Sequence, residues 1–116
     1  MTLFTDGVQR ALERAMDGVA LRQRVMSQNV ANAMTPGYQA QKVEFEGALS
    51  DAVRSGSGIG SVSPTVTGTG AAAREDGNNV EIESETSSLM RSGVQYQALA
   101  QAMSFKFSVL HTAIKG

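Results

Sequence analysis

The sequence predicts a mainly α-helical protein in which long amphipathic helices at the two ends of the chain pair as a coiled coil. Three observations lead to this fold class. Apolar residues recur at helical spacing near both ends of the chain. Aromatic residues make up only 5% of the chain, which favours a thin helical core over a deep globular one. The middle is rich in Gly, Ser and Thr, and it should separate the two helices as a turn, a short helix and a flexible segment.

Residues 1–35 are expected to form the N-terminal helix of the coiled coil. Its apolar positions follow one another at gaps of three or four residues, with one polar exception. They are Leu12, Met16, Val19, Met26, Val30 and Ala33. Charged residues such as Arg10 and Arg22 fall on the opposite face, which we expect to be solvated. Gly18 is expected to weaken this helix by up to about 1 kcal/mol.

Residues 36–79 are expected to hold a turn, a short helix and a flexible segment. The spacing of Phe45, Leu49 and Val53 indicates a short helix that ends near residue 55. The stretch that follows, residues 55–70, reads SGSGIGSVSPTVTGTG. It contains too little apolar surface to offset its chain entropy. We therefore expect this stretch to be flexible, or to become ordered only on a partner.

Residues 80–116 are expected to form the C-terminal helix, after a turn at Asp76-Gly77-Asn78-Asn79. Two series of positions repeat every seven residues along this helix. They are Leu89, Tyr96, Met103 and Leu110, and four positions later Gly93, Ala100, Phe107 and Ile114. Such a heptad pattern is typical of a coiled coil between the two chain ends or between subunits. An ordinary helical hairpin would show the same stripes. No proline interrupts the segment, so we expect a helix of about 25 to 30 residues, or about 40 Å.

No residue pattern in the chain indicates a reaction centre. Its net charge is −1, and no basic patch typical of nucleic-acid binding is visible. The absence of cysteine excludes disulfides and thiolate metal sites. His111 has no nucleophile and orienting carboxylate near it in the sequence, so we expect a solvated surface residue. Glu81, Glu83 and Glu85 are more typical of a helix N-terminus than of a metal site. We therefore expect no enzyme activity, metal or cofactor.

The sequence also gives no sign of a membrane segment. No stretch approaches the roughly 20 apolar residues that a membrane span needs. The first residues, MTLFTDGVQRALERAM, lack the apolar run of a signal peptide. We therefore expect a soluble protein with no direct membrane insertion and no cleavable signal.

One short stretch, SQNVANAMTPGYQAQ at residues 27–41, stands out because it ends the first helix abruptly. Asn29 and Asn32 share a helix face, and an asparagine at a packed position can fix register and partner. Pro36 suits the first corner of a turn, and Gly37 permits the positive φ that a type II turn needs next. Tyr38 follows the corner. A plain proline-terminated helix with a tight turn would use the same residues.

The stretch NVANAMTPGYQ resembles the N-terminal signature of the flagellar rod and hook axial proteins. DGNNVEIESE and YQALAQAMSFKFSVLHTAIKG are similar to the B-type basal-body rod proteins of the proximal rod. The resemblance covers both ends of the chain and leaves out mainly the glycine-rich middle. Gln39 stands where this family usually has Lys or Arg, which puts in doubt a salt bridge after the turn. Thr86 stands where a methionine is common.

The resemblance implies a structural subunit that polymerises into the axial drive shaft of the flagellum and transmits torque. Its implied partners are copies of itself, other rod proteins, the adaptor at the junction of membrane ring and rod, and the type III export apparatus in transit. The abrupt helix end would turn the chain outward, toward the next subunit. We expect the assembly surface to include residues of the turn and of the C-terminal stripe. They are Asn29, Ala31, Asn32, Thr35, Pro36, Gly37, Tyr38, Tyr96, Met103, Phe107, Leu110 and Ile114.

Two other classes of function remain compatible with parts of the sequence. A soluble helical adaptor or an export chaperone of a type III secretion system would also have two amphipathic helices. A rod-associated cell-wall hydrolase would need a catalytic carboxylate in a cleft.

Overall fold

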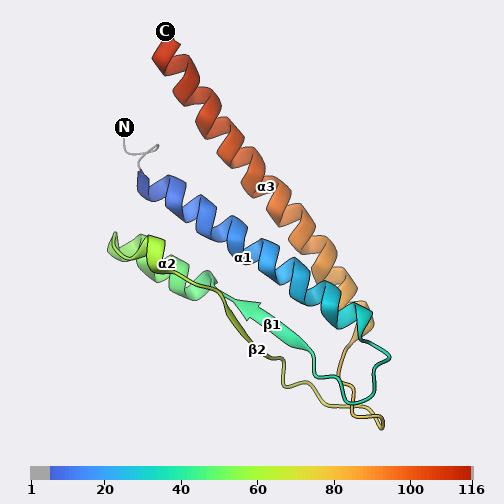
Figure 1. Cartoon of the computed structure of the whole chain (residues 1–116). Helices are drawn as coiled ribbons and strands as arrows, with labels where there is room; N and C mark the ends of the chain where they lie inside the picture. The colour runs from blue at the N-terminus through green and yellow to red at the C-terminus, as the bar shows by residue number, and fades with distance from the viewer. Residues whose placement is uncertain (1–5, 116) are drawn as a thin grey trace.

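The structure, a computed structural model, describes residues 6–115 as an elongated, mainly helical molecule of 64 × 26 × 14 Å (Figure 1). The helix α1 lies in the middle, with α3 along one side and with β1, β2 and α2 along the other. The expected mainly α-helical fold is confirmed. The outer limits of the expected segments, residues 1 and 116, lie outside the described residues. In chain order the elements are α1 (Asp6–Ala31), β1 (Gln41–Glu44), α2 (Glu46–Ser55), the 3-10 helix η2 (Ile59–Ser61), β2 (Thr65–Gly68) and α3 (Ile82–Lys115).

The helix α1 is buried on two sides, whereas its sequence predicts a single apolar face. Val19 and Val25 are buried and pack with Val43 and Phe45, which follow the turn in the chain. Of the expected apolar stripe, Val19 and Ala33 are buried and the other members are half-buried. The second buried side exists because the chain folds back over α1 after the turn.

Two residues of α1 have roles that differ from the expected ones. A Cβ atom at Gly18 would lie 2.4 Å from the ring of Phe45. This glycine therefore makes room for the ring and is not a flaw in the helix. Arg22, expected on a solvated face, has a side chain that is only 14% exposed. Both differences have the same cause, because the segments after the turn cover this face of α1.

The middle of the chain runs back along α1 and does not point outward, which corrects the expected direction after the turn (Figure 1). The strands β1 and β2 pair antiparallel, with Gln41 opposite Gly68 and Glu44 opposite Thr65. Residues 65–68 are therefore a strand, although the composition predicts a flexible stretch. The three β-branched residues of β2 suit a strand, and pairing with β1 satisfies backbone groups that composition alone leaves to water. The short helix α2 ends at residue 55, as expected.

The helix α3 runs antiparallel to α1 and then continues past the described start of α1 (Figure 1). Its 34 residues exceed the expected length and span about 51 Å at 1.5 Å per residue. The hydroxyl of Ser92 lies 3.8 Å from the sulfur of Met26, and Lys106 donates to Gln9. The last turns of α3 therefore extend beyond the described part of α1. Within residues 6–115, no helix combines the length and the apolar character needed to cross a membrane.

Candidate functional site

Two loops that are distant in the sequence meet at one end of the molecule and form what we call the two-loop junction (residues 32–40 and 74–81). The turn predicted at the first loop is present, because Tyr38 N donates to Thr35 O and Gly37 has a φ of +77°. Gly37 N donates to Asp76 O at 2.8 Å. Gly77 has a φ of +84°, and a Cβ atom there would lie 3.2 Å from Gly37 Cα. Gly77 is therefore needed for the close approach of the two backbones, whereas a Cβ atom at Gly37 would meet no atom within 4 Å and this glycine is needed for its positive φ.

Two neighbouring asparagines of the second loop connect it to the first. The side chain of Asn78 is fully buried and donates to Asn32 O at 2.8 Å and to Thr35 O at 2.9 Å. These two carbonyls lie just past the end of α1 and also accept backbone hydrogen bonds within the turn, so the Asn78 amide adds a second donor to each. Asn79 accepts a hydrogen bond from Ala40 N at 2.6 Å. The sequence analysis recognises these residues only as a turn, because their partners are some 40 positions away.

Asn29 connects α1 to β1 and to the start of α3. Its amide nitrogen donates to Gln41 O at 2.8 Å and to Glu85 Oε2 at 3.0 Å. Its amide oxygen accepts from Gln41 N at 3.1 Å and from Tyr38 Oη at 3.2 Å. The residue is 0% exposed. In the single chain the amide of Asn29 is buried and its hydrogen-bonding capacity is used internally, and the partner contact expected from the sequence stays a prediction.

The other expected assembly residues of the turn lie nearer the surface. Asn32 is half-buried and donates to Gln28 O, while its amide oxygen accepts from the Thr35 hydroxyl. Ala31, Thr35 and Pro36 are exposed, and Met34 beside them is 85% exposed. The structure thus separates the turn into a buried part that holds the chain together and an exposed part that is available to a partner.

Gln39, which the sequence analysis noted as a departure from the usual Lys or Arg, also contributes a hydrogen bond to the junction. Its amide nitrogen donates to Gly77 O at 2.7 Å. The residue that follows Tyr38 is therefore connected to the second loop by a hydrogen bond.

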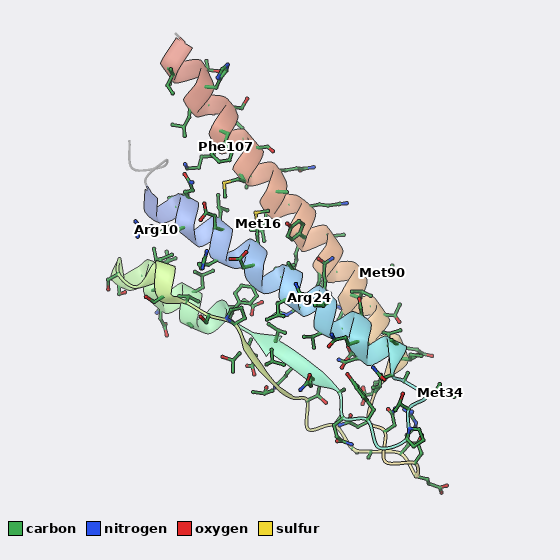
Figure 2. The ribbon with its side chains drawn as sticks, in the orientation of Figure 1. Arg10, Met16, Arg24, Met34, Met90 and Phe107 are labelled. Carbon is green, nitrogen blue, oxygen red and sulfur yellow. The ribbon has the colours of Figure 1, made fainter. Side chains whose placement is uncertain are left out.

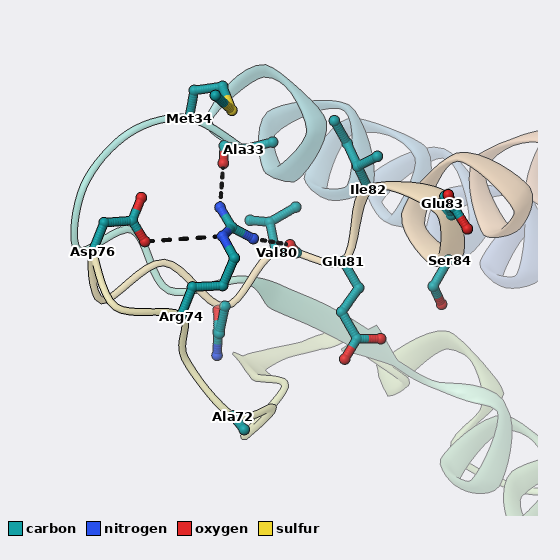
Figure 3. A pocket seen from close by; sticks show the side chains of 11 residues that line it. Ala33, Met34, Ala72, Arg74, Asp76, Val80, Glu81, Ile82, Glu83 and Ser84 are labelled. Carbon is teal, nitrogen blue, oxygen red and sulfur yellow. Dashed lines mark hydrogen bonds and ion pairs between the residues drawn. The ribbon is translucent and has the colours of Figure 1, made fainter.

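An open cavity of about 740 Å³ lies beside the two-loop junction, and Figure 3 shows Arg74 in its wall. The guanidinium group donates to Val80 O and to Ala33 O, each at 2.7 Å. Its Nε atom lies 3.9 Å from a carboxylate oxygen of Asp76. Arg74 therefore connects the end of α1 to the start of α3. The sequence analysis did not identify it, because a single arginine in a loop has no local pattern.

A second arginine connects α1 to the β1–α2 segment. Arg22 donates to both carboxylate oxygens of Glu46 at 2.5 and 2.7 Å, and to Val43 O at 2.6 Å. Its guanidinium carbon lies 5.0 Å from the ring centroid of Phe45. The hydrogen bonds from Arg22 lower the pKa of the Glu46 carboxyl to about 2. The paired carboxylate in turn raises the pKa of Arg22.

The far end of α3 has the opposite character from the two-loop junction. Phe105, Phe107 and Ile114 are 64%, 51% and 85% exposed. Leu110 is half-buried. Lys106 is 3% exposed and donates to Gln9 Oε1 at 3.0 Å. Figure 2 shows Phe107 where α3 passes the start of α1. The C-terminal stripe is thus packed in its first half, where Tyr96 contacts the core, and exposed in its last turns.

The described residues show no arrangement typical of catalysis. Among residues 6–115, no group of His, Asp and Glu side chains is placed to hold a metal ion. His111 is exposed on α3. The buried side-chain nitrogen and oxygen atoms of this part of the chain all have hydrogen-bond partners. The polar groups of the junction therefore hold segments of the chain together, and the surfaces of the molecule become the candidates for function.

Comparison with known proteins identifies relatives along the whole chain, although no family model matches it. The flagellar basal body rod protein FlgB of Bacillus subtilis (strain 168) is 31% identical over 128 residues, covering 100% of this chain and 98% of the relative. FlgB of Aeromonas hydrophila is 32% identical and covers 82% of this chain and 83% of its own length. FlgB of Escherichia coli (strain K12) is 29% identical, with coverage of 85% and 86%. The chain therefore belongs to the FlgB family of flagellar basal body rod proteins.

Proposed function

We propose that this protein is a structural subunit of the proximal rod, which polymerises into the axial drive shaft of the flagellum and transmits torque without catalysis. The observation that carries the proposal is the similarity to the Bacillus subtilis rod protein along the entire chain. In this proposal the subunit lies in the rod across the periplasm. It contacts copies of itself, other rod proteins and the adaptor at the base of the membrane ring.

The exposed end of α3 supports an assembly role. Phe107 and Ile114 continue the stripe that is half-buried at Met103 and Leu110, but they remain exposed in the single chain. Large apolar side chains gathered in solvent are typical of protein–protein contacts. The heptad stripe of α3 extends beyond the described part of α1. This suits a coiled-coil contact that begins between α1 and α3 and continues onto a neighbouring subunit.

The exposed residues of the turn are the second part of the proposed assembly surface. Thr35 and Pro36 lie beside Met34 on the rim of the two-loop junction. Their positions are set by the hydrogen bonds of Asn78 and by the positive φ of Gly37. A rigid, exposed turn loses little entropy when it binds, which favours a contact at a defined angle. We further propose export through the flagellar type III apparatus.

Deletion of the gene tests the proposal. We expect basal bodies with membrane rings and no attached rod by electron microscopy, and we expect a plasmid copy of the gene to restore rods and swimming. Rods of normal length in the deletion strain would refute a rod-subunit role.

A soluble adaptor or export chaperone is the second candidate, because an open apolar groove between α1, α2 and α3 has the character of a helix-binding surface. Fractionation separates the two candidates. A rod subunit should be found in purified basal bodies and should assemble further as its concentration rises. A chaperone should be absent from basal bodies and remain a small, defined oligomer in sedimentation experiments.

A further inference from the structure

The two strands of the small sheet differ in how their outer edges are covered. The outer edge of β1 faces α1, and there the Asn29 side chain bonds both backbone groups of Gln41. The Arg22 side chain bonds Val43 O on the same edge. In contrast, β2 lies on the far side of β1 from α1 (Figure 1). All four of its residues are exposed, and within residues 6–115 no third strand joins it. The outer edge of β2 is therefore open to solvent.

The register of the sheet shows which backbone groups lie on this open edge. Ala40 O accepts a hydrogen bond from the opposite residue, Thr69, at 3.0 Å. Hydrogen-bonded and non-hydrogen-bonded pairs alternate along antiparallel strands. Thr67, two positions before Thr69, therefore turns its backbone groups toward β1. Val66 and Gly68 turn theirs outward, so the N–H and C=O groups of these two residues form the open edge.

These outward groups define the kind of partner that the edge accepts. A row of unpaired backbone N–H and C=O groups is a template for another extended chain, which pairs with it as an additional strand. Charge does not narrow the choice further, because residues 55–73 contain no charged residue. The edge therefore fits an extended segment that needs no charged group for recognition, and β2 of a second copy is such a segment.

Two copies of β2 match each other in one antiparallel register. With Thr67 of one copy opposite Thr67 of the other, Val66 of each copy lies opposite Gly68 of the other. The two outward N–H groups of each copy then all find acceptors, which gives four hydrogen bonds across the contact. A shifted register would place an outward residue opposite Pro64, which has no N–H, or opposite Gly70, whose φ is +73°. The ends of β2 therefore select the register centred on Thr67.

The charges of the sheet do not oppose this pairing. Lys42 and Glu44 of β1 form an ion pair with each other at 3.6 Å. In a continuous sheet of order β1-β2-β2-β1, the two β1 strands are three strand spacings apart, or about 14 Å. This separation exceeds the Debye length of about 8 Å at physiological ionic strength. Like charges on the two β1 strands therefore repel each other only weakly.

We propose that two copies of the free protein associate through the open edge of β2 and form one four-stranded antiparallel sheet across a two-fold axis. The contact is isologous, so it closes on itself and does not propagate. It uses neither the exposed turn nor the exposed end of α3, and the inference therefore goes beyond the proposed rod function. Because only two residues of each copy bond across the contact, the pair is small, weak and reversible.

Cysteine cross-linking of the purified protein tests the register, because the natural chain contains no cysteine. Thr67→Cys places two thiols opposite each other in a non-hydrogen-bonded pair, where the Cα atoms are about 4.5 Å apart and a disulfide can form. Thr65→Cys is the matched control, because Thr65 is also exposed and lies on the same face of β2. In the proposed register its two copies are four residues apart along the strands, or about 14 Å.

We expect Thr67→Cys to yield at least about tenfold more disulfide-linked dimer than Thr65→Cys in a glutathione redox buffer, because the control thiols lie beyond disulfide range. Similar yields from the two variants would show random collision of exposed thiols and would overturn the proposal.

Two lysine variants provide an independent measurement that needs no covalent bond. Thr67→Lys places like charges directly opposite each other at the two-fold axis, which destabilises a strand pair. Thr65→Lys adds the same charge to the same strand but away from the axis. In sedimentation equilibrium we expect the dimer fraction to fall in Thr67→Lys and to persist in Thr65→Lys. Equal dimer fractions would also overturn the proposal. Neither experiment bears on the rod function, which the deletion strain tests separately.

Discussion

The two ends of the molecule differ in where their hydrogen-bonding and apolar groups find partners. At the end that holds the two-loop junction, Asn78 of the junction and Asn29 of the adjoining α1 are fully buried and bind groups from segments far away in the chain. At the distal α3 face, which consists of Phe107, Leu110 and Ile114, Ile114 is 85% exposed and Phe107 is 51% exposed. The first end is complete within one chain, whereas the second has apolar groups without a covering segment among the described residues.

This difference indicates how one small chain can be both stable and ready to assemble. The junction holds α1, β1 and α3 in a defined arrangement before any partner binds. The distal α3 face adds little to that arrangement and can supply binding energy to a contact between subunits. Substitutions at the junction should therefore change the free energy of unfolding of the isolated chain. Substitutions at the distal α3 face should change assembly alone.

The largest effect on unfolding is expected for Asn29→Ala. The substitution removes four hydrogen bonds and leaves the backbone N–H and C=O of Gln41 without their partners. Each poorly solvated group left unpaired costs about 1 to 3 kcal/mol, so we expect a loss of about 3 kcal/mol in urea unfolding followed by circular dichroism. Asn32→Ala is the control and should cost about 1 kcal/mol or less, because Asn32 is half-buried and bonds locally. Equal losses for the two variants would contradict the description of the junction.

Gly37→Val should have the next largest effect. Gly37 has a φ of +77°, a conformation that β-branched residues strongly disfavour. No atom lies within 4 Å of a Cβ placed there, so the cost is backbone strain of about 1 to 3 kcal/mol. The control is Gly47→Ala, also without close neighbours but within helix α2. It should stabilise the protein by about 0.5 to 1 kcal/mol in the same unfolding experiment. Destabilisation by both variants would show that the turn has no special backbone requirement.

Acid should weaken the ion pair between Arg22 and Glu46, which lies between the two ends of the molecule. The pKa of Glu46 is lowered from 4.5 to about 2 in the folded chain. Its contribution is therefore present above pH 4.5 and is lost as the pH falls from 4.5 toward 2. The side chain is 59% exposed, so solvent screening reduces this contribution to about 1 kcal/mol or less. Unfolding free energies at pH 6 and pH 3 should differ by less in Glu46→Gln than in the natural protein. An identical pH dependence would exclude a stabilising role of the pair.

The smallest effect on unfolding is expected for Ile114→Asp. The residue is 85% exposed, so the unfolding free energy should change by no more than about 0.5 kcal/mol. Swimming and rod formation should nevertheless be lost, because a charge would be buried without a partner in the contact between subunits. Met90→Asp, at a similarly exposed position near the junction, is the matched control and should swim. A swimming Ile114→Asp strain would remove the distal α3 face from the assembly surface.

The helices and the turn could be predicted closely, because each depends on residues that are near in the sequence. The first helix, expected to end at residue 35, ends four residues earlier at Ala31, and the short helix ends at Ser55 as expected. The proline and glycine of the turn act through their own backbone angles. The site could be predicted only in part. Asn29 was recognised as unusual, but its partners Gln41 and Glu85 could not be read from its neighbours.

The sequence alone determined three helices, a turn with positive φ at Gly37, and a chain without a recognisable reaction centre. The tertiary structure decided which helix faces are covered. It placed the Phe45 ring against Gly18, where a larger residue would clash with the ring. It also brought Arg22 from a solvated face to Val43 and Glu46, and placed Asn78 against the end of α1. The physical reason is that helical periodicity is a local property, whereas burial depends on which distant segment folds over a face.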